Sequence, residues 1–335
     1  MPTRYRRKDC PIVSDASLTR VWGRFAERLA LPAVWIGTII LFGALLPNNF
    51  LTSGNFSAMF SSQTSLLVLA LALMIPLTAG DYDLSVASVA GLSSMVVAVL
   101  NVNHHWPIVA AVIAALIVSV LIGLINALVS IAIGVDTLIV TLGMGTLLEG
   151  VVSWLGDSTT VSGISNGLVN IVVASRFLGI PLEFWYGVIL CAVLWFFLEF
   201  TPVGRRLLIV GRGREVARLS GMRVKAIRGG ALMCSAALGG VAGILLAGTT
   251  GAADPTSAPL LLLPAFAAVF LGATTISPGR FNAWGCLVAV LFLVTGITGL
   301  QQLGAQTYVQ SLFYGAALIV AVVLSFLVRP RSAKV

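Results

Sequence analysis

Residues 64–102 read TSLLVLALALMIPLTAGDYDLSVASVAGLSSMVVAVLNV, and Asp81 and Asp83 are the only charged residues among them. On each side of this acidic pair the sequence is apolar for about the length of a membrane helix, which needs about 20 such residues. The apolar residues form continuous blocks, not the alternating ten-residue segments of a membrane barrel. The stretch therefore predicts two membrane-spanning helices joined by a short polar break.

The same pattern extends over most of the chain. Of its 335 residues, 58% are hydrophobic and 10% are charged, whereas a soluble domain is about 45–50% apolar and about 25% charged. This composition excludes a soluble enzyme, a nucleic-acid-binding protein and a disordered chain. The predicted fold class is all-α, a polytopic membrane protein with about ten transmembrane helices. The predicted spans are 30–47, 58–79, 84–102, 107–133, 136–155, 184–200, 229–249, 259–276, 283–303 and 308–328.

The basic residues predict how these spans are oriented. The chain has 20 lysines and arginines, and 19 of them lie in 4–28, in 205–228, at Arg280 or after residue 328. Ten spans and a cytoplasmic N-terminus place all 19 in the cytoplasm and only Arg176 outside. Because cytoplasmic loops of membrane proteins are rich in lysine and arginine, both termini and the loop 201–228 are predicted to be cytoplasmic. The net charge of +8 thus needs no nucleic acid to explain it.

Three regions follow from this topology. Residues 1–29 form a cytoplasmic N-terminal segment, 30–328 the transmembrane domain with its basic loop at 201–228, and 329–335 a cytoplasmic tail. Within 17–29 the apolar residues recur at helical spacing with arginines between them, which is typical of an interfacial amphipathic helix; a solvated leader is the alternative. The segments Thr137–Val152 and Thr307–Val322 match at several positions, five spans apart, and indicate an inverted repeat.

The break Ala79–Val86 admits two compatible interpretations. Two carboxylates beside an apolar span are costly unless they are hydrated, paired or in a cavity. A broken helix near a pore or at the cytoplasmic mouth would account for them. Alternatively, Asp83 caps the third span while Asp81 lies in water.

The basic loop 201–228 contains one amphipathic segment. Val216, Leu219 and Met222 are spaced three residues apart, opposite Arg214 and Arg218, which predicts a short helix that ends near a glycine. The segment is either a solvated topology anchor or a docking helix for a cytoplasmic partner. In the seventh predicted span, a pair of glycines four residues apart, at 239 and 243, predicts close helix packing.

Four segments together resemble one protein family. Gly80–Val86 (GDYDLSV) is similar to the motif G-x-[IF]-D-L-S-V-G, and Asn126–Gly145 ends in TLIVTLGMG, similar to F-I-V-T-L-G-T-M. Glu215–Met222 (EVARLSGM) is similar to E-A-A-R-L-S-G-I, and Leu263–Arg280 resembles the segment L-x-A-I-A-A-V-V-L-G-G with its glycine-rich tail. In this order they resemble the bacterial ABC transporter permeases for ribose, xylose, arabinose and galactose, the branched-chain amino-acid/sugar permease family. The resemblance covers about residues 30–330.

The resemblance implies a transport subunit of the bacterial inner membrane that takes up a sugar or related polyol by alternating access. Its partners would be a cytoplasmic ABC ATPase, a periplasmic substrate-binding protein, a second permease subunit as homodimer or heterodimer, and membrane lipid. Catalytic residues and metal ligands are not expected, and ATP and Mg²⁺ would bind to the ATPase, because this chain lacks a phosphate-binding G-x-x-x-x-G-K-[ST] loop. The residues implied for the translocation pathway or gate are Asp81, Asp83, Ser85, Asn126 and Thr141. Those implied for coupling to the ATPase are Arg214, Glu215, Val216, Arg218, Leu219, Ser220, Gly221 and Met222.

An ion-coupled secondary transporter of a small polar solute is the alternative. Its candidate ion-coupling carboxylates are Asp83, Asp136, Glu149 and Asp254. The sequence also departs from the family pattern along the expected pathway, at Asp136 and at two positions, 262 and 264, where many members carry acidic residues. These departures leave the identity of the solute open.

Overall fold

The computed structural model describes residues 16–328, with side chains described for 28–325. Within that range nine helical segments are long and apolar enough to cross a membrane, and the sheet content is limited to two short antiparallel pairs, β1–β4 and β2–β3. The predicted all-α membrane fold is therefore confirmed. The predicted tail 329–335 and the first fifteen residues of the N-terminal segment lie outside the described residues.

The helices and strands follow one another along the chain with short connections. In order they are α1 (Ala16–Leu45), α2 (Ser53–Ser62), α3 (Thr64–Thr78), α4 (Val86–Ala98), η1 (Val99–Asn103), α5 (Ile108–Ala127), η2 (Leu128–Ile133), α6 (Thr137–Leu155), β1 (Val161–Ser162), α7 (Asn166–Val169), η3 (Asn170–Ala174), β2 (Arg176–Phe177), β3 (Ile180–Pro181), α8 (Leu182–Phe200), α9 (Pro202–Arg212), α10 (Arg214–Leu219), α11 (Val224–Thr250), β4 (Ala252–Ala253), η4 (Pro259–Leu261), α12 (Leu262–Gly272), α13 (Ala283–Gln302) and α14 (Thr307–Val328).

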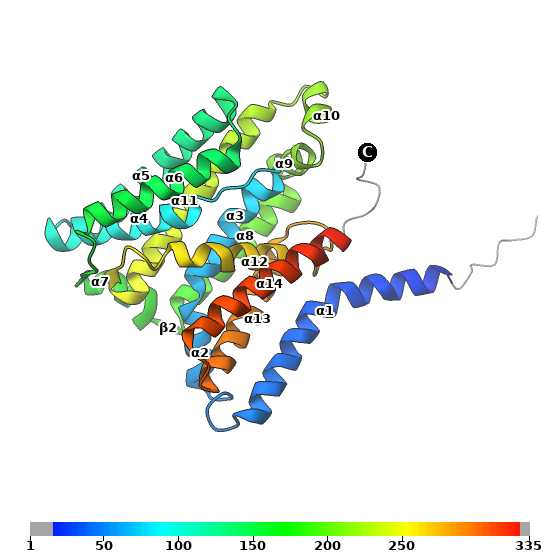
Figure 1. Ribbon diagram of the computed structural model, residues 1–335, viewed down its shortest axis with the longest axis horizontal. Helices are drawn as coiled ribbons and strands as arrows, with labels where there is room; N and C mark the ends of the chain where they lie inside the picture. The colour runs from blue at the N-terminus through cyan, green and yellow to red at the C-terminus, as the bar shows by residue number, and fades with distance from the viewer. Residues whose placement is uncertain (1–15, 329–335) are drawn as a thin grey trace, which may run out of the picture.

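The bundle has two distinct ends. Figure 1 shows α9 and α10 at one end, here called the α10 end, and α7 at the opposite end, here called the α7 end. The strand pair β1–β4 joins the loop after α6 to the chain after α11 near α7. The polar connections of the sequence are thus sorted to two ends of a helical bundle, as a membrane-spanning chain requires.

Nine predicted spans correspond to long helical segments, and the eighth, 259–276, is shorter. Its helical part is Pro259–Gly272, about 21 Å at 1.5 Å per residue, against a hydrocarbon core of about 30 Å. The helix ends because residues 273–281 fold into tight turns. The side-chain amide of Asn282 then donates to the carbonyls of Gly272 and Thr275, at 3.1 Å each.

This short segment nevertheless connects the two ends. The chain enters it from β4 at the α7 end and leaves it at Arg280, whose guanidinium lies 3.7 Å from Glu199, next to the last residue of α8. Residues Pro264–Gly272 are all buried. The helical centre of the segment is therefore enclosed by protein, whereas its flanks are partly exposed, at Leu260 and Ile276.

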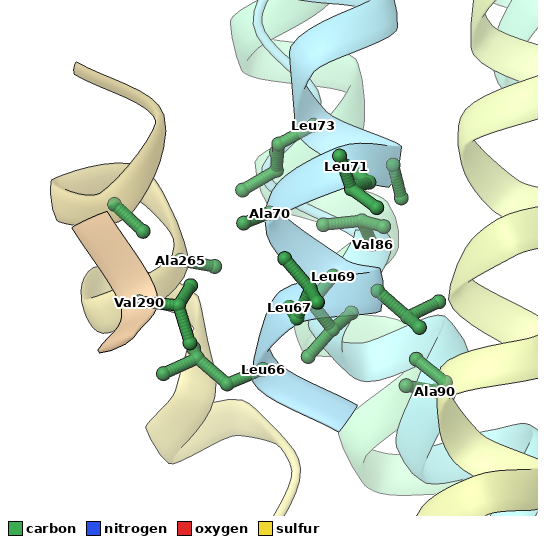
Figure 2. Packing of buried hydrophobic residues seen from close by; sticks show 14 of the residues in the cluster. Leu66, Leu67, Leu69, Ala70, Leu71, Leu73, Val86, Ala90, Ala265 and Val290 are labelled. Carbon is green, nitrogen blue, oxygen red and sulfur yellow. The ribbon is translucent and has the colours of Figure 1, made fainter. Parts of the chain in front are cut away.

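The core is organised around α3, in which every residue is buried. Figure 2 shows leucine side chains leaving α3 toward both sides, with Ala265 and Val290 on one side and Val86 and Ala90 on the other. These neighbours belong to α12, α13 and α4. A span enclosed by protein needs no polar face, and the sequence of α3 has none.

The long helix α11 packs against α3, α4 and α5. A Cβ atom added at Gly243 would lie 2.1 Å from the carbonyl oxygen of Ala90, and one at Gly239 would lie 3.0 Å from Val86. Only glycine permits the backbones of α11 and α4 to approach this closely. The predicted packing role of the glycine pair is confirmed.

Helix α1 covers both the predicted interfacial helix and the first predicted span. It runs through Pro32 without interruption, and Figure 1 shows it bending along its length. The indole of Trp35 donates to Thr295 on α13 at 2.9 Å, which ties the spanning part to the bundle. The side chains of 16–27 lie outside the described residues, so the interfacial helix stays a prediction.

Candidate functional site

A linker of seven residues, 79–85, joins α3 to α4 and contains both acidic residues of the motif. Gly80 has a φ of 80°, a left-handed conformation that glycine adopts without steric cost, so the chain turns away directly after α3. The N–H groups of Gly80 and Asp81 donate to the carbonyls of Leu77 and Pro76, at 3.1 and 2.9 Å. The predicted break in the helix is confirmed, and it lies at the α10 end.

Asp81 is buried and accepts hydrogen bonds from two arginines. Arg228 donates from Nε at 2.7 Å and from Nη2 at 2.6 Å, and Arg214 donates from Nη2 at 2.9 Å. The hydroxyl of Thr137 adds a fourth bond at 3.1 Å. The Asp81 side chain is only 2% exposed, and a carboxylate so buried is costly unless it is paired and hydrogen-bonded. The interpretation that places Asp81 in water is therefore wrong.

This ion cluster joins four segments of the protein. Arg214 is the first residue of α10, Arg228 lies in the second turn of α11, and Thr137 is the first residue of α6. Arg214 also donates to the carbonyl of Gly80 at 2.6 Å. The Arg228 side chain is 17% exposed and that of Arg214 is 44% exposed. The solvent-facing arginine thus attaches α10 to the linker, and the buried one attaches α11.

Asp83 is fully buried and, unlike Asp81, is hydrogen-bonded by neutral groups. Its carboxylate accepts from the hydroxyl of Ser235 at 2.7 Å, and from the N–H and hydroxyl of Ser85 at 3.0 and 2.7 Å. The amide of Asn126 donates to the same Ser85 hydroxyl at 2.9 Å. Burial raises the pKa of the Asp83 carboxyl, and the hydrogen bonds from Ser85 and Ser235 oppose that rise. Asp83 bonds the N–H two residues ahead, as in an Asx turn, while the N-cap of α4 is Ser85.

Thr141 fastens the linker to α6. Its hydroxyl accepts from the N–H of Leu84 at 3.0 Å and donates to the carbonyl of Thr137 at 2.8 Å. All five predicted pathway residues, from Asp81 to Thr141, are buried between the linker, α5, α6 and α11. They face protein and not lipid, as polar groups at membrane depth must. Their role in solute passage stays a prediction.

The predicted basic loop contains two helices, and only one was predicted. Helix α9 begins after Thr201, whose hydroxyl accepts from the N–H of Gly204 at 3.1 Å, and has a proline in its first turn. The pair Thr201-Pro202 is a helix-start signal that identifies α9 in retrospect. Helix α10 is shorter than predicted, because it ends at Leu219 and the chain turns at Gly221.

The exposed face of α10 is apolar at two positions. Val216 is 67% exposed and Leu219 is 76% exposed. Glu215 and Arg218 form an ion pair on the same helix, and the hydrogen bond from Arg218 lowers the pKa of Glu215. Met222 is half-buried and lies beyond the turn, so it is not part of a continuous helical stripe with the other two. Two exposed branched side chains within a charged rim form a surface suited to a protein partner.

The remaining candidate carboxylates are dispersed. Asp136 accepts from the N–H of Leu138 at 2.8 Å and is the N-cap of α6. Asp254 is half-buried in the loop after β4, where hydrogen bonds from Thr256 and Thr160 lower its pKa. Glu149 is exposed on α6 and accepts from Ser88 at 3.3 Å. Their separation gives no shared ion site with Asp83.

Sequence reasoning missed a third buried carboxylate, Glu183, at the α7 end. It accepts from the hydroxyl of Ser61 and from that of Thr249 at 2.6 Å, and its residue is fully buried. It therefore links α2, α8 and α11. Its partners are 122 and 66 residues away in the sequence, and its position at the start of an apolar span resembles an ordinary helix-start acid.

Comparison with known proteins places this geometry in context. Residues 55–322 match the family described as branched-chain amino acid transport system, permease component. The D-allose transport system permease protein AlsC of Escherichia coli (strain K12) is 29% identical over 307 residues, which cover 92% of this chain and 93% of AlsC. No solved structure matches the chain.

Two further relatives have similar coverage. The autoinducer 2 import system permease protein LsrD of Salmonella typhimurium (strain LT2) is 30% identical over 314 residues, 90% of this chain and 92% of LsrD. The L-arabinose ABC transporter permease protein AraH of Azospirillum brasilense is 29% identical over 314 residues, 94% of this chain and 91% of AraH. In each case the match extends over nearly the whole of both proteins.

Proposed function

The chain belongs to the family of branched-chain amino acid transport system permease components, and we propose that it is the membrane subunit of an ATP-driven ABC importer for a sugar or related polyol. Relatives that match nearly its whole length are permeases named for D-allose, autoinducer 2 and L-arabinose transport. Two of these names specify sugars, which supports that solute class. Binding and hydrolysis of ATP are assigned to a separate cytoplasmic subunit, and delivery of solute to a periplasmic binding protein.

The orientation assigned here makes the α10 end cytoplasmic. Among the basic residues with described side chains, only Arg176 lies at the α7 end. The clustering of positive charge around α9, α10 and Arg280 agrees with the usual bias of cytoplasmic loops. We assign the chain to the bacterial inner membrane, and this charge bias supports an orientation with both termini in the cytoplasm.

The observation that carries the proposal is the bond between α10 and the linker. Val216 and Leu219 on α10 would contact the ATPase, while Arg214 at its start bonds Asp81 and Gly80. A displacement of α10 by the ATPase would therefore act on the linker directly. Because Asp81 in the linker also bonds Thr137 and Arg228, a movement of the linker would displace α6 and α11 as well. That displacement would change the packing around Asp83.

The exposed face of α6 supports a pathway or a second permease subunit beside it. Glu149 lies on this membrane span with an exposed side chain, between Thr146 and Ser153, which are one turn away on either side. A carboxylate facing acyl chains is costly, so such a face normally meets water or protein. We assign this face of α6 to the contact with a second permease subunit, at the edge of the solute path.

Uptake by proteoliposomes tests the function. Vesicles would contain this chain with the ATPase that co-purifies with it and the cognate binding protein, and would be offered labelled D-allose and L-arabinose. We expect uptake to require ATP and to stop when the P-loop lysine of the ATPase is replaced. Uptake that continues with the inactive ATPase, but stops when the ion gradient is collapsed, would establish the ion-coupled alternative.

A further inference from the structure

A cavity of about 650 Å³ lies at the α10 end, between α3, α8, α9 and the start of α11. Its walls are mainly apolar and include Ile75, Phe197 and Leu207. Two arginines, Arg206 and Arg223, also line it. The cavity is separate from the Asp81 cluster, whose two arginines do not line it.

The charges of these two arginines are not neutralised by nearby acids. Within residues 28–325, neither Arg206 nor Arg223 makes an ion pair or donates a side-chain hydrogen bond. By contrast, the arginines at 214, 218, 228 and 280 each have a carboxylate partner. The cavity is therefore apolar inside and carries two free positive charges.

The cavity extends from the surface at the α10 end into two membrane spans. Ile75 and Phe197 each lie three residues before the end of their membrane spans, α3 and α8. Arg206 is on α9 and Arg223 immediately precedes α11, outside the spans. A ligand that fills the site thus needs an apolar part at the depth of the acyl chains and an anionic part at the membrane surface.

We propose that this cavity binds an anionic phospholipid from the leaflet that meets the α10 end. Arg206 and Arg223 bind the phosphate, and an acyl chain lies against Ile75 and Phe197. Basic pockets between membrane helices on the cytoplasmic side are suited to acidic headgroups. Because the cavity also touches the turn at Gly221 after α10, a bound lipid would hold that turn in place. The proposal does not depend on which solute the chain transports.

Native mass spectrometry of the full chain in an uncharged detergent tests this site with phosphatidylglycerol and phosphatidylcholine. We expect retention of phosphatidylglycerol at concentrations where phosphatidylcholine is lost. The double variant Arg206→Gln/Arg223→Gln should bind phosphatidylglycerol about twenty-five-fold more weakly, at about fivefold for each arginine near a membrane surface. The matched control is Arg205→Gln/Arg212→Gln, which removes the same charge from α9 at positions that do not line the cavity.

A second variant tests the apolar part with both arginines intact. Gly230 lines the cavity, and a Cβ atom added there meets nothing within 4 Å. Gly230→Leu should therefore fold and should fill the space intended for the acyl chain, so phosphatidylglycerol binding is expected to fall. As an independent readout, phosphatidylglycerol but not phosphatidylcholine should slow maleimide labelling of Cys234, which also lines the cavity, in a Cys10→Ser background.

Several outcomes would overturn the proposal. Equal weakening in the control pair would mean that phosphatidylglycerol is attracted by surface charge alone. Unchanged affinity in Arg206→Gln/Arg223→Gln or in Gly230→Leu would exclude the cavity as the binding site. Full displacement of the lipid by millimolar glycerol phosphate would mean that a free phosphate group, without acyl chains, is the ligand. If Arg206→Gln/Arg223→Gln binds phosphatidylglycerol normally but loses the ATPase subunit, the cavity belongs to the ATPase contact and not to a lipid.

Discussion

Replacing Arg214 by glutamine should weaken the attachment of α10 to the linker and leave the attachment of the linker to α11 intact. The variant loses the 2.9 Å pair with Asp81 and the charge on the bond to Gly80, whereas Arg228 still pairs with Asp81. The matched control is Arg218→Gln, which removes the same charge from the same helix. Arg218 pairs only with the exposed Glu215, among the described residues, and does not touch the linker.

The structure sets the size of the expected effect. The Arg214 side chain is 44% exposed, so solvent screens its pair with the buried Asp81. An exposed ion pair contributes up to about 1 kcal/mol, and a hydrogen bond to a charged group about 1.5–3 kcal/mol. We therefore expect the attachment of α10 to the linker to weaken by about 1–2 kcal/mol. That is a small part of the roughly 5–15 kcal/mol by which folded proteins are stable, so the variant should fold.

Replacing Asp81 by asparagine should be more harmful. The change leaves Arg228, only 17% exposed, without a negative partner. Breaking a buried pair by removing one partner costs about 3–5 kcal/mol, and we expect the lower part of that range because Arg214 is half in water. A double-mutant cycle between positions 81 and 214 should return a coupling energy of about 1–2 kcal/mol.

The assay measures ATP hydrolysis and solute uptake by the same proteoliposomes. In Arg214→Gln, we expect the ATPase to co-purify in normal amount and to hydrolyse ATP, while uptake falls by about tenfold, the factor that 1.4 kcal/mol represents. Arg218→Gln removes a charge only from the rim of the expected ATPase contact, so uptake should stay within about twofold. If the two variants transport equally well, Arg214 does not transmit motion to the linker. If Arg214→Gln instead loses the ATPase, the residue acts at the ATPase contact and the proposed route is wrong.

Three further predictions concern docking, packing and topology. Leu219→Asp should reach the membrane in normal amount and lose the ATPase on purification, because it places a charge in the expected contact. If the variant keeps both the ATPase and uptake, α10 is only a solvated topology anchor. Gly243→Ala should lower the unfolding temperature because its methyl group would overlap the backbone of α4. Gly230→Ala, which has open space around the added methyl group, should be neutral or stabilising. Equal unfolding temperatures of the two variants would exclude a close α4–α11 contact. Reporter fusions at Arg28, Arg214 and Lys334 should report the cytoplasm, and a fusion at Gly163 should report the outside. A reversed signal at any of these sites would contradict the assigned orientation.

Hydropathy and charge predicted the helical architecture well because each acts over a whole span. The limits of the eighth span were less predictable, since residues 273–276 are apolar enough to extend the segment although the helix ends at Gly272. Helix α9 was missed for the opposite reason. Its arginines lower the mean hydropathy, and only the local cap at Thr201 marks its start.

The polar site was predicted in part. Asp81 and Asp83 were identified because carboxylates next to apolar spans are costly, but the partner residues were not. Arg214 and Arg228 lie 133 and 147 residues from Asp81 in the sequence, and no local spacing relates them to it. Only the packing of α10 and α11 against the linker brings the charges together.

The enclosure of α3 has a consequence for how the protein is made. Helices α8, α11, α12 and α13 surround it, yet α11 begins 146 residues after α3 ends. At a synthesis rate of about 5–20 residues per second, roughly 7–30 s pass before that neighbour exists. During this interval acyl chains must cover the surfaces that protein later covers. The uniformly apolar sequence of α3 suits both environments, because lipid tails are about as apolar as leucine. A polar substitution on α3 would therefore interfere twice, first with insertion during synthesis and later with assembly of the finished bundle.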